Sequence, residues 1–161
     1  MSAYVGLGAN LGDARVALAA AVQALAALPA TRLAAVSSLY ASAPVDAGGP
    51  DYFNAVACLQ TTLAPLALLR ALQAIETAAG RTRPYRNAPR TLDLDLLLYD
   101  AVQCADAELT LPHPRMMQRA FVVLPLAELA PERVSAAQRA AVAGQRIERV
   151  APAPDWYSSK R

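Results

Sequence analysis

The chain has 161 residues, of which 55% are hydrophobic, and it carries a formal net charge of +2. This length fits one domain over residues 1–161 with a substantial core, and the small charge argues against a general nucleic-acid binder. No apolar run approaches the roughly 18 residues of a membrane span, and we expect no signal peptide. These features argue against a nucleic-acid or a membrane partner, and we expect a cytoplasmic monomer.

Cysteine and lysine usage narrows the chemistry further. Cys58 and Cys104 form neither a CxxC motif nor a disulfide framework, which favours reduced thiols in the cytosol. Lys160 is the only lysine, so the chain lacks the GxxxxGK[ST] motif of a P-loop. Any bound phosphate must therefore be held by arginine, by a metal ion or by backbone amides.

Hydrophobic periodicity and turn residues predict the elements in chain order. The first half is expected to hold a strand over 3–8, a helix from the N-cap Asp13 to about Leu28, and paired strands over 31–43 and 52–61 around a loop. The next helix should be capped by Thr62, with Pro65 in its first turn and Gly80 as the C′ residue that ends it. A polar loop over 81–89, a leucine-rich strand, a short stretch over 109–114 and an apolar helical segment to about Leu129 follow. The tail after that segment is weakly specified.

The order strand, helix, strand, strand, helix, strand is typical of a split-βαβ sheet. We therefore expect an α+β, ferredoxin-like fold with helices on one face of the sheet and the other face free for a site. Added C-terminal helices would give a three-layer α/β/α arrangement.

The segment "RTLDLDLLLYD", residues 90–100, places two carboxylates in the most apolar predicted strand. Because side chains alternate across a strand, one face is expected to carry Leu92, Leu94, Leu96 and Leu98, and the other Thr91, Asp93, Asp95 and Leu97. The two aspartate Cβ atoms should lie about 7 Å apart, which suits two divalent cations about 3.5–4 Å apart. Oxygen ligands with substrate phosphates favour Mg²⁺. A solvent-facing strand with two surface acids is the simpler alternative.

Four arginines lie within ten residues before these aspartates, in a loop that also contains prolines: Arg81, Arg83, Arg86 and Arg90. A polyphosphate site needs such guanidinium groups beside metal-binding carboxylates. The same residues could instead form a solvated ion network in which the arginines pair with the aspartates.

Aromatic and amide side chains suggest a second wall. Tyr52 and Asn54 lie two apart on one predicted strand, so they share a face, and an aromatic ring beside an amide can stack on and read a flat heterocycle. Phe121 could supply a second stacking ring, although core packing also explains it. His113, held between two prolines, is either structural or a donor to a phosphate oxygen.

The N-terminal segment "GLGANLGD" fails the dinucleotide-binding fingerprint, because position 11 is leucine rather than glycine. Gly6 and Gly8 are interpreted as tight strand-to-helix geometry near a ligand.

With these residues placed, the sequence closely resembles the 6-hydroxymethyl-7,8-dihydropterin pyrophosphokinases of folate biosynthesis. The resemblance extends over essentially the whole chain and is strongest from about Ala3 to Leu129. The most specific blocks are "PDYFNAV", "PRTLDLDLLLYD" and "LPHPRMMQRAFVVLPLAEL". It implies a ferredoxin-like fold and the transfer of a diphosphoryl group from ATP to the pterin hydroxymethyl oxygen, with release of AMP.

The resemblance also implies roles for individual residues. Asp93 and Asp95 would bind two Mg²⁺ ions together with ATP, and Arg81 and Arg90 would hold the transferring phosphates. The ATP would be contacted by Gln73, Glu76, Arg83, Leu96, Thr110, His113 and Arg119. The pterin would be bound by Ser42, Val45, Tyr52, Asn54 and Phe121.

The chain departs from the family pattern at several positions. Asn87 and Ala88 replace a tryptophan and glycine of a loop that closes over the substrates, Pro114 replaces an aromatic residue, and Glu108 replaces an arginine near the nucleotide. Two alternatives stay open: a related Mg²⁺-dependent pyrophosphokinase or nucleotidyltransferase with another acceptor, and a ferredoxin-like regulatory module whose charged cluster is structural.

Overall fold

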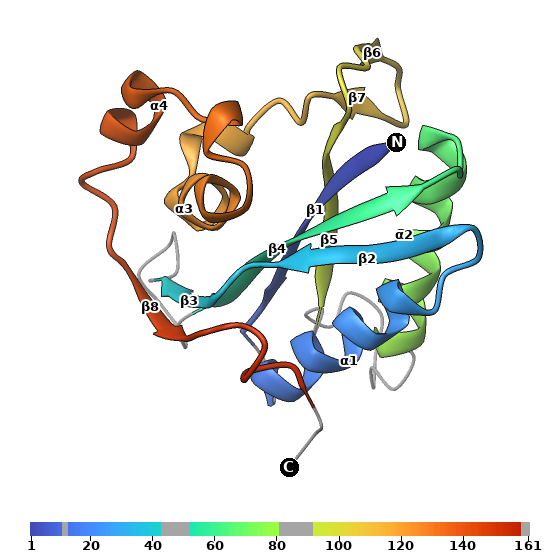
Figure 1. Ribbon diagram of the computed structural model, residues 1–161, viewed down its shortest axis with the longest axis horizontal. Coiled ribbons are helices and arrows are strands. Elements are labelled where there is room, and N and C mark those ends of the chain that lie inside the picture. The colour runs from blue at the N-terminus through green and yellow to red at the C-terminus, as the bar shows by residue number, and fades with distance from the viewer. Residues whose placement is uncertain (11–12, 43–51, 81–91, 159–161) are drawn as a thin grey trace.

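The computed structural model describes residues 1–10, 13–42, 52–80 and 92–158. Over these ranges the chain is an α+β fold built on a six-stranded antiparallel sheet, with a separate two-stranded hairpin (Figure 1). The spatial order of the sheet is β5 (Asp93–Tyr99), β1 (Ser2–Ala9), β4 (Tyr52–Thr61), β3 (Leu39–Ser42) and β8 (Ile147–Ala151), and β2 (Thr31–Val36) also pairs with β4. The hairpin consists of β6 (Cys104–Ala105) and β7 (Thr110–Leu111).

Helices lie on both faces of the sheet, as Figure 1 shows, with α1 and α2 on one side and α3 and α4 on the other. Their bounds are α1 (Ala14–Ala26), α2 (Pro65–Gly80), α3 (Ala120–Leu129) and α4 (Ala136–Ala141), with 3₁₀ turns η1 (Met116–Gln118) and η2 (Pro131–Arg133). The expectation that one sheet face would be free is therefore wrong in part, because α3 covers some of it.

The face under α1 and α2 holds the larger core. Fully buried leucines project from both helices onto the sheet, where they meet the leucines of the β5 segment. This first core includes Leu18, Leu25, Leu68, Leu72, Leu92, Leu94 and Leu96. The helical period of α1 and the strand period of β5 thus converge on one apolar layer, whereas α2 buries Leu68 and Leu72 and leaves Leu66 exposed.

The opposite face holds a second core under α3. Val123 and Leu126 of α3 pack on Val56 of β4 and on Leu97 and Leu98 of β5. A helix with little polar surface is buried in this way because it has no wide face to turn toward water.

The position of Leu98 corrects the predicted alternation. Tyr4 pairs with Leu98 while the next residue of β1, Val5, pairs with Leu96, so Leu97 is an extra residue in β5. Such a bulge shifts every later side chain to the other face. Leu98 therefore joins the second core, and Tyr99 takes the place in the first core, where its hydroxyl donates a hydrogen bond to the Leu63 carbonyl.

Helix boundaries agree with the prediction at α1 and differ at α2. Val16 N–H donates to Asp13 Oδ1 at 3.2 Å, which confirms Asp13 as the N-cap. Thr62 is not a cap, because α2 begins at Pro65 and Leu68 N–H donates to the Ala64 carbonyl at 2.9 Å. Gly80 is the last residue of α2 rather than a residue beyond its end.

The paired strands expected over 31–43 and 52–61 also need one correction. The second is confirmed as β4, whereas the first divides at Ser37 and Ser38 into β2 and β3. Ser37 explains the break. Its side-chain hydroxyl accepts a hydrogen bond from Val56 N–H at 2.9 Å. In a continuous strand a backbone carbonyl would accept that bond instead.

The C-terminal tail is ordered by contacts that the sequence pattern did not predict. β8 extends the sheet beside β3, and Trp156 is buried with its indole N–H donating to the Ser37 carbonyl at 2.9 Å. Among the described helices, none has both the length and the apolar character needed to cross a membrane.

Candidate active site

Three site residues lie on the sheet face that α3 only partly covers. In the sheet register Gly8 pairs with Asp93 on one side and with Asn54 on the other, and Gly6 pairs with Asp95. Directly paired residues project from the same face of a sheet. Asp93, Asp95 and Asn54 therefore share this face, as predicted, and both aspartates are exposed while Leu94 between them is buried.

Asn54 is held in one orientation by its neighbours. Ser42 Oγ donates to Asn54 Oδ1 at 2.9 Å, and both side chains are buried. The opposite end of the amide lies over β1, because a Cβ added to Gly8 would be 3.0 Å from Asn54 Nδ2. The hydrogen bond thus fixes the amide with its N–H donors on the side of Gly8 and Asp93.

Gly8 has a different role from the predicted one. It lies inside β1 rather than in a turn between strand and helix. Its missing side chain leaves room for the Asn54 amide between β4 and β5, and a larger residue would push that amide away. Gly6 and Gly8 lie two residues apart on one strand and therefore share a face. This spacing in the sequence indicates that β1 carries no side chains on that part of the sheet.

Two of the predicted nucleotide residues contact the outer edge of β5. Glu76 of α2 accepts a hydrogen bond from Leu94 N–H at 2.7 Å, and His113 N–H donates to the Leu97 carbonyl at 2.9 Å. Gln73 lies one turn before Glu76 on α2, and Thr110 is exposed on β7, three residues before His113. The structure therefore places Glu76 and His113 against the strand that carries the aspartates, whereas Gln73 and Thr110 are exposed on neighbouring elements.

His113 has a defined hydrogen-bonding state on one side of its ring. Arg115 N–H donates to His113 Nδ1 at 3.2 Å. In a neutral imidazole whose Nδ1 accepts, the proton is on Nε2, which is then a donor. The half-buried ring can thus offer one N–H to an oxyanion.

Leu96 is buried in the first core, so its side chain turns away from the aspartate face. Any ligand contact at this position would come from its backbone. Glu108, which replaces a family arginine, pairs with Arg70 of α2 at 2.5 Å across the surface. This exposed ion pair contributes little stability. It shows that the carboxylate of Glu108 contacts Arg70.

Arg119 and Phe121 lie together at the start of α3. The guanidinium carbon of Arg119 is 5.4 Å from the centroid of the Phe121 ring, a cation–π arrangement. Both residues are half-buried, and Phe121 also packs at the margin of the second core. Tyr52, at the start of β4, is half-buried on the face of Asn54.

Glu128 is a polar anchor for α3 that the sequence reading missed. Its carboxylate accepts hydrogen bonds from the Ser38 N–H and hydroxyl at 3.0–3.1 Å and from the Tyr40 hydroxyl at 2.9 Å. Burial, and then this hydrogen bond, raise the pKa of Tyr40 well above its usual range. These contacts fix α3 to the strands beside Asn54, since Tyr40 pairs with Asn54 in the register.

Four predicted site residues lie outside the described ranges: Arg81, Arg83, Arg90 and Val45. Within residues 1–10, 13–42, 52–80 and 92–158, no group of three or more histidine, cysteine, aspartate or glutamate side chains forms a ready metal cluster. The predicted metal ligands, Asp93 and Asp95, are both exposed. Two carboxylates suit a hard cation that completes its shell with water and substrate phosphates.

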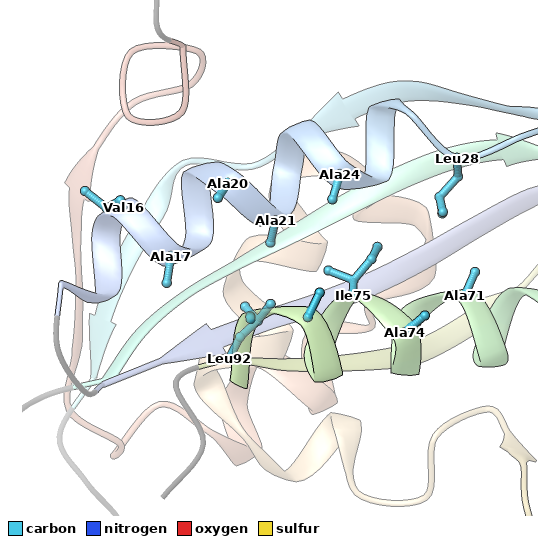
Figure 2. A pocket seen from close by; sticks show the side chains of 12 residues that line it. Val16, Ala17, Ala20, Ala21, Ala24, Leu28, Ala71, Ala74, Ile75 and Leu92 are labelled. Atoms are coloured by element: carbon cyan, nitrogen blue, oxygen red, sulfur yellow. The ribbon is translucent and has the colours of Figure 1, made fainter. Parts of the chain in front are cut away.

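An apolar cavity of about 660 Å³ lies between α1 and α2, and Figure 2 shows its lining. Most lining residues are alanines, such as Ala17 and Ala21 of α1 and Ala74 and Ala78 of α2, and Leu92 closes one end. Leu92 belongs to the sheet face opposite the aspartates. This cavity offers no charged group to a phosphate and is separate from the candidate site.

Comparisons with known proteins identify relatives of the chain. Residues 4–131 match the family model described as 7,8-dihydro-6-hydroxymethylpterin-pyrophosphokinase. A protein of Pseudomonas aeruginosa is 52% identical over 130 residues (80% of either chain), and one of Bacillus subtilis is 42% identical over 130 residues (79% of this chain and 77% of the relative). A third, of Pseudomonas putida, is 53% identical over 114 residues, 71% of this chain and 95% of the relative. All three are named 2-amino-4-hydroxy-6-hydroxymethyldihydropteridine pyrophosphokinase.

Proposed function

The chain belongs to the 7,8-dihydro-6-hydroxymethylpterin-pyrophosphokinase family, and we propose that it transfers the diphosphoryl group of ATP to 6-hydroxymethyl-7,8-dihydropterin in folate biosynthesis. The hydroxymethyl oxygen forms a bond to the β-phosphorus and loses its proton. The bond from the β-phosphorus to the oxygen shared with the α-phosphorus breaks, and AMP leaves with that oxygen. The observation that carries the proposal is the single open sheet face shared by Asp93, Asp95 and Asn54.

Asp93 and Asp95 are the proposed ligands of two Mg²⁺ ions that bind with ATP. When bound, the ions neutralise phosphate charge and hold the transferring group, which is most of what phosphoryl transfer requires. The exposure of both carboxylates on one face supports this role, because substrate phosphates and water can reach them from solvent.

Arg81 and Arg90 are proposed to hold the transferring phosphates, with Arg83 assisting. Their support is the sequence alone: they immediately precede the strand of Asp93 and Asp95, and guanidinium forks match phosphate oxygens.

The pterin is proposed to bind over Gly8, between the start of β4 and the start of α3. Asn54 would donate its Nδ2 hydrogens to acceptor atoms on the edge of the ring, since Ser42 already occupies Oδ1. Tyr52 and Phe121 would stack on its two faces, and Val45 would line the pocket.

ATP is proposed to lie along the outer edge of β5. His113 Nε2–H would donate to a phosphate oxygen, and Arg119 would add positive charge. The remaining contacts would come from Gln73, Glu76, Leu96 and Thr110. Because Glu76 already accepts from the β5 backbone, it would align the strand edge as well as meet the nucleotide.

The fold proposal is a ferredoxin-like arrangement. Its support is the element order β1–α1–β2/β3–β4–α2–β5 and the sheet order β5, β1, β4, β3, with α1 and α2 on one face. Helices α3 and α4 and strand β8 are then additions to that unit.

We also propose one catalytic domain over residues 1–161 that acts as a cytoplasmic monomer. Cys58 and Cys104 are both free thiols, which suits a reducing compartment. The binding partners of the protein would be its two substrates, ATP and the pterin.

The reaction is tested by supplying ATP, Mg²⁺ and 6-hydroxymethyl-7,8-dihydropterin together and separating the nucleotides. The proposal expects AMP and the pterin diphosphate in equal amounts. A matched control uses 6-methyl-7,8-dihydropterin, which lacks the accepting hydroxyl and should give no AMP. Formation of ADP, or of no nucleotide product, would contradict diphosphoryl transfer. The regulatory-module alternative is not favoured, because the three relatives described above are named as pyrophosphokinases.

A further inference from the structure

The two walls proposed for the pterin come from distant parts of the chain. One wall is Asn54, oriented by Ser42 on the sheet, and the other is Phe121 with Arg119 at the start of α3. A ring that stacks on Phe121 while its edge accepts hydrogen bonds from Asn54 requires a fixed spacing between the two residues, because both contacts weaken when they separate. Some contact must therefore hold the start of α3 relative to β3.

Gln145 makes that contact on the α3 side. Its Oε1 accepts a hydrogen bond from Ala120 N–H, and its Nε2 donates to the Gln118 carbonyl, both at 2.8 Å. The two bonds bracket Arg119 and fix the backbone that leads into Phe121. Ala120 is the first residue of α3, and Arg119 provides no side-chain cap, so Gln145 also satisfies an N–H that the helix cannot pair.

The same short segment reaches the other wall. Ile147, two residues after Gln145, pairs with Ser42 in the β3–β8 register. Ser42 is the residue whose hydroxyl orients Asn54. Residues 145–147 thus contact the supports of both walls at once, while Trp156 fastens the following tail to Ser37. This segment lies beyond residues 4–131, where the chain matches the family.

We propose that Gln145 is a positioning residue that sets the spacing between the α3 wall and the Ser42–Asn54 wall of the pterin subsite. The inference rests on the proposed function, because it assigns Phe121 and Asn54 to one ligand. Gln145 would not touch the pterin. Its effect would pass through the backbone of residues 118–120.

The test compares Gln145→Met, which keeps side-chain length but loses both hydrogen bonds, with Gln145→Glu, which keeps the acceptor for Ala120 N–H. The measurement is the dissociation constant of 6-hydroxymethyl-7,8-dihydropterin, followed by its fluorescence, in the presence of Mg²⁺ and an ATP analogue that cannot be cleaved. We expect Gln145→Met to weaken pterin binding about fivefold, as the loss of two surface hydrogen bonds allows, and Gln145→Glu to lie between it and the unaltered chain.

Gln138→Met is the matched control. Gln138 also accepts a backbone N–H, that of Ser135 at 2.8 Å, but it does so in the capping box of α4. Its replacement should lower thermal stability, because that hydrogen bond is lost, while leaving pterin affinity unchanged.

Equal pterin affinity in Gln145→Met and Gln138→Met would overturn the inference, whatever their stabilities. If Gln145→Met does not fold, the pterin dissociation constant of Gln145→Glu becomes the test. An unchanged constant in that variant would also overturn the inference. Absence of AMP formation by the unaltered chain would refute the proposed function instead, so the two failures are distinguishable.

Discussion

The two faces of the central sheet are built from the same strands but carry different kinds of residue. On the face under α1 and α2, leucines and alanines pack into one apolar core. On the opposite face, β1 carries glycine, β5 carries aspartate and β4 carries a buried asparagine. Strand alternation lets one segment, Asp93–Tyr99, contribute its leucines to stability and its aspartates to chemistry. Changes on the two faces should therefore have separable effects.

The largest effect is expected from Asp95→Ala or Asp93→Ala on the open face. Each change removes a proposed cation ligand, and we expect turnover to fall about 10³-fold, the scale of losing a preorganised charge contact. Because both side chains are exposed, the thermal midpoint should change little. Steady-state AMP formation and a melting curve measure both effects.

Asp155→Ala, at another exposed aspartate, is the control and should keep full turnover. Near-normal activity in either of the β5 variants, or unfolding of both, would remove the support for the cation site.

The opposite behaviour is expected on the helix-covered face. Leu72→Ala empties a fully buried position on α2 and should lower the free energy of unfolding by about 3 kcal/mol, with Michaelis constants unchanged. Leu66→Ala, on the same helix but 43% exposed, should lower it far less. Urea unfolding of both variants measures the difference, and equal losses would show that α2 is not packed as described.

A smaller effect is expected at Gly8. An alanine Cβ there would lie 3.0 Å from Asn54 Nδ2, so Gly8→Ala must displace the amide, and we expect the Michaelis constant for the pterin to rise about tenfold, or about 1.4 kcal/mol. Gly6→Ala is the control, since its Cβ would meet only the Leu97 side chain at 3.5 Å, an ordinary contact. If both variants raise the constant equally, the Asn54 orientation is not the cause.

The smallest effect concerns how α3 is held over the open face. Because the folded state raises the pKa of Tyr40, the unfolded state loses the tyrosine proton first once the pH exceeds about 10. The free energy of unfolding should then fall as the pH rises above that value, and Tyr40→Phe should fall less steeply. Denaturant unfolding between pH 8 and 11 measures both slopes, and identical slopes would contradict the burial of the Tyr40 hydroxyl beside Glu128.

Local patterns in the sequence predicted the parts of this molecule that depend on period and on turn chemistry. The leucine and aspartate alternation, the strand of Tyr52 and Asn54 and the Asp13 cap follow from such rules, and the family was identified from the same blocks that the comparisons match. The prediction for Leu98 is wrong because a bulge depends on the partner strand, which a single segment does not reveal.

Contacts between distant segments were not predicted from the sequence. Glu128 meets Ser38 and Tyr40 across about 90 positions of the chain, and Gln145 meets residues 118 and 120 from the far side of α4. Neither side chain belongs to a local motif. The prediction of Thr62 as a cap is wrong because the helix begins only at Pro65. Long-range polar partners are set by tertiary packing, so propensity and spacing carry no signal for them.

The central claim is that Asp93 and Asp95 capture divalent cations together with the phosphates of ATP. Calorimetric titration of an uncleavable ATP analogue, with and without Mg²⁺, tests it most directly when the unaltered chain is compared with the Asp93→Asn, Asp95→Asn double variant. We expect Mg²⁺ to tighten nucleotide binding strongly in the unaltered chain and to have almost no effect in the double variant. An equal Mg²⁺ dependence in both proteins would contradict it.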